Sequence, residues 1–422
     1  MSTNARIYLD YASSTPLLPD VKQAMADALD EGGNPSSIHQ AGQRMKGHLE
    51  QARRQVAALI NAKPDEISFT SCGTESNNWA LRGLSAANKR KGNHLVISAI
   101  EHPSISLAAR RLEIDGLSNV TILSVDGEGL ISPSDLKAAL KPETVLVSVM
   151  LANGEVGTIE PIQELAAIAH EHGALFHTDA IAAVGHLPVD VRALGVDALS
   201  LAANQFYGPQ GAAALFVRDG VRILPLLEGG GQEHGARSGT EALPAIVGMG
   251  VAAEYARTRL VGTGDAEPGP PSDRSERRAI GCGGARTDGV AQRQDPSQLQ
   301  RLRDQLRDGL KERIEHIRFN GSWTSRLPHN LHVCIEGVSS ESLVLGLDQA
   351  GIAAGLGSAC NSKAMRPSHV LKAMGLSDEE AKGALVLTVG VPTTEEEINR
   401  ALEVIPTVVQ QLRSVTALTA RA

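Results

Sequence analysis

The chain has 422 residues, of which 42% are hydrophobic and 21% charged. These proportions are ordinary for a globular protein, and the length allows two or three domains with a large core. The net charge of −8 argues against nucleic acid or an anionic membrane as the main partner. The N-terminal residues show no charged-then-apolar signal pattern and no run of about 18 apolar residues occurs, so we expect a cytosolic protein without a membrane span.

Apolar runs typical of buried strands alternate with helical patterns through the first half of the chain. Residues 40–61 repeat apolar side chains at helical spacing, and the strand candidates are residues 94–98, 120–123, 145–150 and 174–177. This alternation predicts an α/β fold with a mostly parallel central sheet and helices on both faces. In such sheets ligands bind at the carboxyl ends of the strands, so the residues directly after each strand are candidates for function.

The composition changes near residue 262. Residues 262–297 are rich in glycine, proline and charged side chains and lack apolar periodicity, which predicts a flexible insert that is dispensable for folding. After the insert, the pattern indicates a smaller α+β domain that ends in a helix with a capping box at residues 394–397 and a kink at Pro406. We predict a large domain at 14–255 and a small domain formed by 1–13 with 299–422.

Four polar motifs follow the predicted strands. Residues 71–76 precede a helix and offer backbone N–H groups that suit a phosphate. His102 follows the strand at 94–98, and the polar loop 152–158 follows the strand at 145–150. Asp179 stands at the tip of another apolar strand, where a carboxylate is costly unless it pairs with a cation or a protonated ring nitrogen. Together these motifs predict a pocket for a phosphorylated pyridine, namely pyridoxal phosphate.

A fifth motif occupies residues 200–211, with the sequence SLAANQFYGPQG. Its glycines and proline predict a tight turn of the kind that presents a reactive side chain just before it. The residues at that position are Asn204 and Gln205, whose neutral amides cannot take up a proton at neutral pH or attack a carbonyl carbon.

In these motifs the chain resembles the cysteine desulfurase family, within the class V aminotransferase group of pyridoxal phosphate enzymes. The resemblance covers nearly the whole chain except the insert, and it rests on residues 8–12, 33–37, 71–76, 101–103, 153–155, 177–180, 229–231, 237–240, 357–360 and 393–397. It implies a class V aminotransferase-like fold and a homodimer.

The resemblance also implies roles for individual residues. Gly73 and Thr74 would hold the cofactor phosphate, and Thr240 would reach into the same site of the partner subunit. His102 would stack on the cofactor ring, and Asp179 would face the ring nitrogen. Asn153 would lie beside the ring, and Cys360 would be the mobile-loop thiol that takes sulfur from the substrate as a persulfide.

This chain departs from the family pattern at the positions that carry the chemistry. The lysine that binds the cofactor as a Schiff base is replaced by Gln205, and the neighbouring histidine by Asn204. The arginine that binds the substrate carboxylate is replaced by Val386. Glutamine cannot form an imine, and loss of the arginine removes a bidentate charge-assisted contact. We therefore expect pyridoxal phosphate, if bound, to lack a covalent link.

Two hypotheses about function follow. In the first, the protein has lost conventional desulfuration and acts in sulfur relay or as a scaffold through Cys360, with an acceptor or iron–sulfur assembly protein as partner. An iron–sulfur cluster with Cys360 and Cys72 as ligands belongs to this hypothesis, as does the absence of any cofactor. The alternative is an active pyridoxal phosphate enzyme, a cysteine desulfurase or a related lyase or transferase, that binds the cofactor non-covalently or uses another base such as Lys363.

Overall fold

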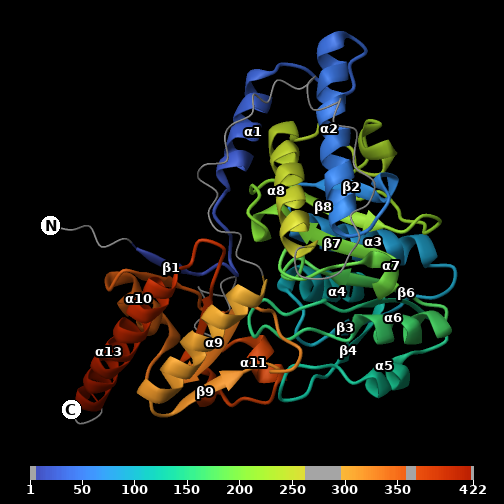
Figure 1. Cartoon of the computed structure of the whole chain (residues 1–422). Helices are drawn as coiled ribbons and strands as arrows, with labels where there is room; N and C mark the ends of the chain where they lie inside the picture. Colours follow the sequence, from blue (N-terminus) through green and yellow to red (C-terminus); the bar gives the residue numbers. More distant parts are fainter. Residues whose placement is uncertain (1–5, 262–295, 358–366, 420–422) are drawn as a thin grey trace.

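The computed structural model describes residues 6–261, 296–357 and 367–419. Its larger part is built on a seven-stranded sheet with the strand order β2-β8-β7-β6-β5-β3-β4 (Figure 1). The strands are β2 (Ile67–Thr70), β3 (His94–Ser98), β4 (Asn119–Leu123), β5 (Thr144–Ser148), β6 (Leu175–Asp179), β7 (Ala198–Ala202) and β8 (Ala213–Val217). Strands β3 to β7 pair in parallel, and β8 runs antiparallel to both of its neighbours. The predicted α/β fold with a mostly parallel sheet is confirmed.

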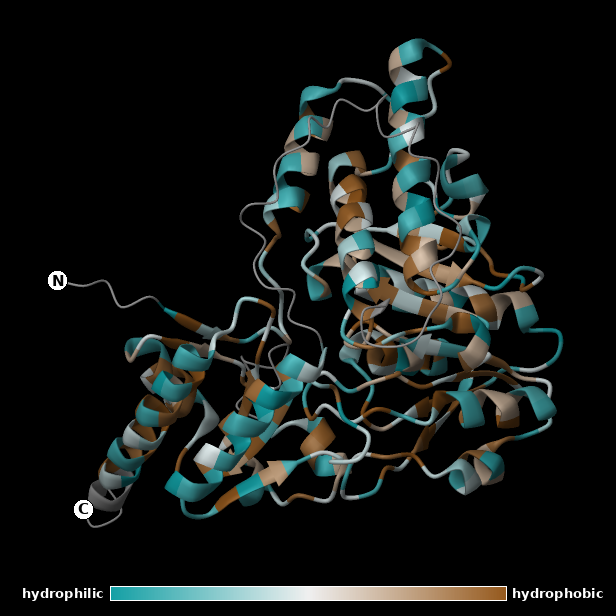
Figure 2. Cartoon of the chain, in the orientation of Figure 1, coloured by the Kyte–Doolittle hydropathy of each residue, from teal (hydrophilic) through white to brown (hydrophobic). Residues whose placement is uncertain are grey.

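Helices cover both faces of this sheet. One face packs against α3 (Gly73–Asn88) and α4 (Pro103–Ile114). The other face packs against α2 (Gln40–Leu59), α5 (Pro133–Ala139), α6 (Ile162–Glu171) and α8 (Leu243–Val261). Every residue of β3, β5 and β7 is buried, because a strand covered on both faces must be apolar or internally bonded on both. Figure 2 shows hydrophobic residues, in brown, along the central strands and hydrophilic residues, in teal, over much of α1 and the outer part of α2.

The remaining elements of the larger part are short or peripheral. They are α1 (Pro19–Asp30), which lies beside α8, the single-turn helices η1 (Pro64–Glu66), η2 (Ala203–Gln205) and η3 (Gln232–Gly235), and α7 (Val191–Leu194).

The smaller part contains two small sheets of its own. An antiparallel sheet has the order β12-β10-β9, with β9 (Ile317–Asn320), β10 (Asn330–Ile335) and β12 (Ala384–Thr388). A parallel pair joins β1 (Ile7–Leu9) to β11 (Ile352–Ala354), so the beginning of the described chain lies in this part. Its helices are α9 (Pro296–Arg313), α10 (Ser340–Gln349), α11 (His369–Ala373), α12 (Asp378–Ala381) and α13 (Glu395–Thr419). Leucine, isoleucine and valine side chains from α9, α10, α13 and the strands form a separate core.

The capping box predicted for the last helix is present. The Thr394 N–H donates to Glu397, and the Glu397 N–H donates to the Thr394 hydroxyl. The helix continues through Pro406 to Thr419. Most of the predicted flexible insert, residues 262–295, lies outside the described residues; its last two residues begin α9, where Pro296 suits a first helical turn.

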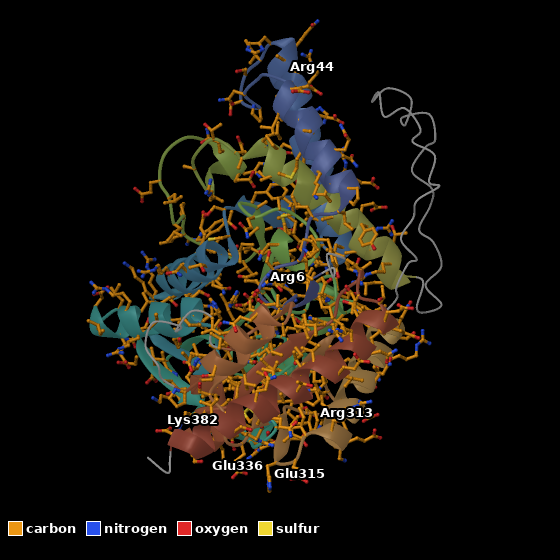
Figure 3. All side chains as sticks on the ribbon, turned by 90° about the vertical axis from the view of Figure 1, so that its left-hand side faces the viewer. Arg6, Arg44, Arg313, Glu315, Glu336 and Lys382 are labelled. Atoms are coloured by element: carbon orange, nitrogen blue, oxygen red, sulfur yellow. The ribbon has the colours of Figure 1, made fainter. Side chains whose placement is uncertain are left out.

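The surface of the described chain carries charges of both signs. Figure 3 shows Arg44 on α2 at one end of the molecule and, at the opposite end, Arg313, Glu315, Glu336 and Lys382. None of the helices in the described ranges has the length and apolarity needed to cross a bilayer.

A buried ion pair ties the loop at η3 to α2 and β2. The Arg53 guanidinium donates to both carboxylate oxygens of Glu233 at 2.7 and 2.8 Å, and these residues are only 1% and 5% exposed. The same carboxylate accepts the Phe69 N–H of β2. Glu233 and His234 have φ values of 48° and 58°, in the left-handed region that non-glycine residues seldom adopt. The ion pair therefore holds a strained loop in place.

We predict that Glu233→Gln lowers the free energy of unfolding by about 3 kcal/mol, because it removes the buried carboxylate that pairs with Arg53 and leaves the guanidinium with Glu50, whose side chain is 34% exposed. Urea unfolding followed by circular dichroism measures the change. Arg54→Met on the exposed side of α2 is the control and should change stability by less than about 0.5 kcal/mol. A loss equally small in Glu233→Gln would show that the pair does not hold this loop.

Candidate active site

A cavity of about 680 Å³ lies at the carboxyl ends of β3, β5, β6 and β7. Its walls come from the loops after these strands, from residues 12–13 after β1, and from β11 and β12 of the smaller part. The cavity thus lies where the two parts of the protein meet. Among the residues that sequence reasoning selected, Cys72, Gly73, Thr74, His102, Asn153, Asp179 and Gln205 all line it.

The N-terminus of α3 opens into the cavity. Cys72 is the N-cap residue and its side chain makes no capping hydrogen bond. The first N–H groups of an α-helix have no acceptor within the helix, so those of Gly73 and Thr74 are available to an anion. A Cβ atom on Gly73 would lie 2.2 Å from Cδ1 of Ile181, so a larger residue at this position would have to displace the Ile181 side chain.

A second ion pair fixes the approach to this helix. The Arg237 Nε donates to Glu75 Oε1 at 2.7 Å, and the other carboxylate oxygen accepts from the Ser71 hydroxyl and N–H. These hydrogen bonds hold the pKa of Glu75 below its ordinary value although burial raises it. Thr240, three residues beyond Arg237, is exposed and does not line the cavity of its own chain. Its expected role in a partner subunit stays a prediction.

Asp179 and His102 belong to one buried hydrogen-bond network. Asp179 Oδ2 accepts from the Asn77 side chain at 2.7 Å, and Oδ1 accepts from the Ile181 N–H at 3.0 Å. The Asn77 amide also donates to the Ser104 hydroxyl, which lies 2.8 Å from His102 Nδ1. Asn77, one turn into α3, was not identified from the sequence. Its position four residues after Gly73 could have indicated it, because residues four apart lie on the same face of a helix.

The two titratable groups of this network shift in opposite directions. Burial raises the pKa of Asp179, while the hydrogen bonds from Ile181 and Asn77 and the nearby His102 lower it in part. Burial lowers the pKa of His102, and the Asp179 charge partly offsets this effect. Nδ1 of His102 accepts the Ser104 N–H, which places the proton of the neutral ring on Nε2.

Asn153 lines the cavity and also folds its own loop. Its Oδ1 accepts the N–H groups of Glu155 and Val156, and its Nδ2 donates to the Ile100 carbonyl oxygen. These contacts satisfy the amide within the protein, so Asn153 shapes the cavity wall. Its neighbour Glu155 has a side chain only 7% exposed; Oε2 accepts from the Ser368 hydroxyl, and Oε1 has no hydrogen bond but lies 3.7 Å from His332 Nε2.

The 203–205 turn presents Gln205 to the cavity. The Gln205 side chain is 8% exposed, and its Nε2 donates to the carbonyl oxygens of Ala12 and Ser13 at 3.0 and 3.4 Å. Its backbone carbonyl oxygen accepts from His186 Nε2. The amide therefore joins the turn after β7 to the segment after β1, and it supplies no basic group.

The ionisable groups on the described cavity wall are mostly carboxyl groups. Its carboxyl groups are Asp10, Glu101, Glu155 and Asp179, and no lysine or arginine lines it within the described residues. Glu101 is fully buried, with one oxygen accepting the Met150 N–H, and burial raises its pKa well above the ordinary value. Asp10 and His369 were not identified from the sequence, because nothing local to them shows that the fold brings them to this cavity.

The residues fit a phosphorylated pyridine in part. The N-terminus of α3 suits the phosphate, and Asp179 with the His102 ring suits the pyridine. No lysine lies on the described wall, so no described side chain there could form an imine with the cofactor aldehyde. Cys360 and Lys363 lie outside the described residues, and within the described ranges no three His, Cys, Asp or Glu side chains are grouped to hold a metal ion.

Comparison with known proteins gives consistent matches. A family model described as aminotransferase class-V matches residues 7–261. A protein named cysteine desulfurase IscS from Dictyoglomus turgidum is 42% identical over 411 residues, which is 97% of this chain and 96% of that protein. Its namesake from Methanosarcina thermophila is also 42% identical, over 417 residues, 99% of this chain and 95% of that protein. A solved NifS-like protein is similar with a TM-score of 0.83 at 30% identity, over 96% of this chain and 99% of its own.

Burial raises the pKa of Glu155 to about 7. A raised pKa means that the folded state favours the protonated carboxyl, so this contribution to stability is complete below about pH 4.5 and is lost as the pH rises through 7. We predict that Glu155→Gln becomes more stable relative to the wild type by about 2–3 kcal/mol between pH 5 and pH 8. Urea unfolding at a series of pH values measures this difference.

Glu341→Gln, at an exposed position on α10, is the matched control and should follow the wild-type profile. Parallel pH profiles for Glu155→Gln and the wild type would contradict the prediction.

Proposed function

We propose, because this chain belongs to the cysteine desulfurase group of the class V aminotransferase family, that it is a pyridoxal phosphate-dependent enzyme that holds its cofactor without a covalent link. Its reaction would be that of a desulfurase or of a related lyase or transferase. The observation that carries the proposal is the cavity at the sheet edge, where the N-terminus of α3 and buried Asp179 lie in one wall.

The family relationship supports an active enzyme more strongly than the hypothesis of lost activity. Relatives named cysteine desulfurase are 42% identical over nearly their full length. The ring-binding residues of the cavity also remain hydrogen-bonded to one another, with Asn77 joining Asp179 to Ser104. The buried Oδ1 of Asn77 has no hydrogen-bond partner among the described residues, and a buried polar atom of this kind is costly unless a bound ligand or water completes its hydrogen bonds.

Each residue has a role in this proposal. Gly73 and Thr74 would bind the phosphate, His102 would lie against the ring, and Asp179 would face the ring nitrogen. When bound, the cofactor supplies an electron-withdrawing ring that stabilises negative charge next to a substrate amine. Because Nδ1 of His102 accepts the Ser104 N–H, the neutral ring carries its proton on Nε2 and could donate a hydrogen bond from that atom.

A second candidate function is sulfur relay or scaffolding through Cys360, with an iron–sulfur cluster or an acceptor protein as partner. The specific observation that favours it is the chemistry of Gln205 and Val386, which line the cavity and offer neither an amine nor a cation. This candidate requires no cofactor in the cavity, so cofactor binding distinguishes the two.

We predict that the purified protein binds pyridoxal phosphate reversibly in isothermal titration calorimetry and keeps none after borohydride treatment and dialysis. Asp179→Ala should weaken binding at least tenfold, or about 1.4 kcal/mol, because it removes the charge that faces the ring nitrogen. Gln205→Lys should retain a borohydride-reduced adduct, seen by mass spectrometry. Gln210→Lys, on the exposed turn outside the cavity, is the matched control.

Absence of binding in the wild type would favour the relay or scaffold function instead. A covalent adduct in the wild type would show that another lysine, such as Lys363, serves as the anchor. Sulfide release from L-cysteine that depends on Cys360 would identify an ordinary desulfurase.

A further inference from the structure

One end of the cavity is formed by residues that lie far apart in the sequence. Gly355, just after β11, and Val386 of β12 exchange two backbone hydrogen bonds of 3.0 and 2.9 Å. A Cβ atom on Gly355 would lie 2.7 Å from Asp10 Oδ1 and 3.4 Å from Val386 Cβ. The carboxylate of Asp10 and the apolar side chain of Val386 therefore flank the same glycine, and all three residues line the cavity.

Asp10 has no cationic partner among the described residues. Its Oδ2 accepts from the Ser13 hydroxyl at 2.6 Å, and no lysine, arginine or histidine of the described chain pairs with it. Val386 is 2% exposed and continues an apolar strand. This part of the cavity wall thus consists of the Asp10 carboxylate and the apolar Val386 side chain.

An α-amino acid would place its carboxylate against such a wall at a cost. Burying a carboxylate without a cation or several N–H donors is strongly unfavourable, and a neighbouring carboxylate increases the cost. The described wall has four carboxyl groups and no lysine or arginine. Of the described wall, the N-terminus of α3 is the feature that suits an anion, and it would already hold the cofactor phosphate.

We propose that this cavity takes a primary amine that carries no α-carboxylate, with Val386 and Asp10 as the residues that exclude the carboxylate. The proposal rests on the proposed function, because it assumes that a pyridoxal phosphate group occupies the other end of the cavity. The substrate class is a small alkylamine in place of an amino acid, so of the reactions proposed above this inference selects a lyase or transferase and excludes desulfuration of cysteine.

Two stable conjugates test this preference without any turnover. N-(5-phosphopyridoxyl)ethylamine and N-(5-phosphopyridoxyl)-L-alanine share the ring, the phosphate and the amine linkage, and they differ by one carboxylate. Isothermal titration calorimetry with the cofactor-free wild-type protein at pH 8 gives both dissociation constants. We expect the ethylamine conjugate to bind at least tenfold more tightly.

Substitutions at the two wall residues should change this preference in a defined direction. V386R supplies a cation and should reverse the preference, so that the alanine conjugate binds more tightly. V386L keeps the wall apolar and should preserve the wild-type ratio. D10N removes the negative charge of Asp10 and leaves β12 unchanged. It should reduce the ratio of the two dissociation constants at least threefold. T407R adds an arginine at an exposed site on α13 and should leave the ratio unchanged.

The outcomes separate this inference from the proposed function. Equal binding of the two conjugates by the wild type, or tighter binding of the alanine conjugate, overturns the inference and leaves a cofactor-binding cavity in place. Failure of both conjugates to bind overturns the proposed function, and the inference falls with it. Thermal unfolding would show whether V386R folds. If it does not, the ratio of the two dissociation constants in D10N decides the question. A narrowed ratio supports the proposal, and an unchanged ratio shows that Asp10 does not exclude the carboxylate.

Discussion

The carboxyl ends of four parallel strands meet along one edge of the central sheet, and the candidate active site depends on that constraint. A parallel strand must be followed by a crossover that returns to the opposite edge, so the first residues of each crossover gather at the same place. His102 follows β3, Asn153 follows β5, and Asp179 ends β6. Gln205 follows β7 in the turn before the antiparallel strand β8. The cavity is the space that these crossovers enclose with the smaller part.

Buried carboxyl groups give this cavity its electrostatic character. Asp179 and Glu101 lie in its wall and accept backbone N–H groups, from Ile181 and Met150 respectively. These hydrogen bonds offset only part of the cost of burial, because the pKa of each carboxyl stays above its ordinary value. The wall is therefore suited to a ligand that brings a ring nitrogen or an amine, and among the described residues the N-terminus of α3 is the feature that suits an anion.

The two parts of the protein supply different residues to the cavity wall. The larger part supplies the groups that fit a phosphorylated ring, among them Gly73 and Asp179. The smaller part and the segment joined to it supply Asp10, Gly355 and Val386, which line the same cavity. Because separate elements carry the two sets, a change in substrate class needs no change in the groups that would bind the ring.

The sequence by itself determined the features that depend on neighbouring residues. Helical spacing of apolar side chains located α2, and the all-apolar runs located β3 and β5 to within a few residues, because the period of side-chain burial is a local property of helix and strand. The motifs after each strand identified Gly73 and Asp179 as cavity residues, since strand ends in a parallel sheet share an edge.

Only the tertiary structure decided which distant residues meet. Arg53 and Glu233 are 180 positions apart, and no local pattern shows that one neutralises the other. The same holds for Asp10 beside Val386, and for Asn77 between Asp179 and Ser104. Burial also has no signature in a single residue: Glu155 reads as an ordinary loop glutamate, and its raised pKa comes from packing that several elements complete together. Charge, exposure and partner are properties of the folded chain, and they decide what the cavity can bind.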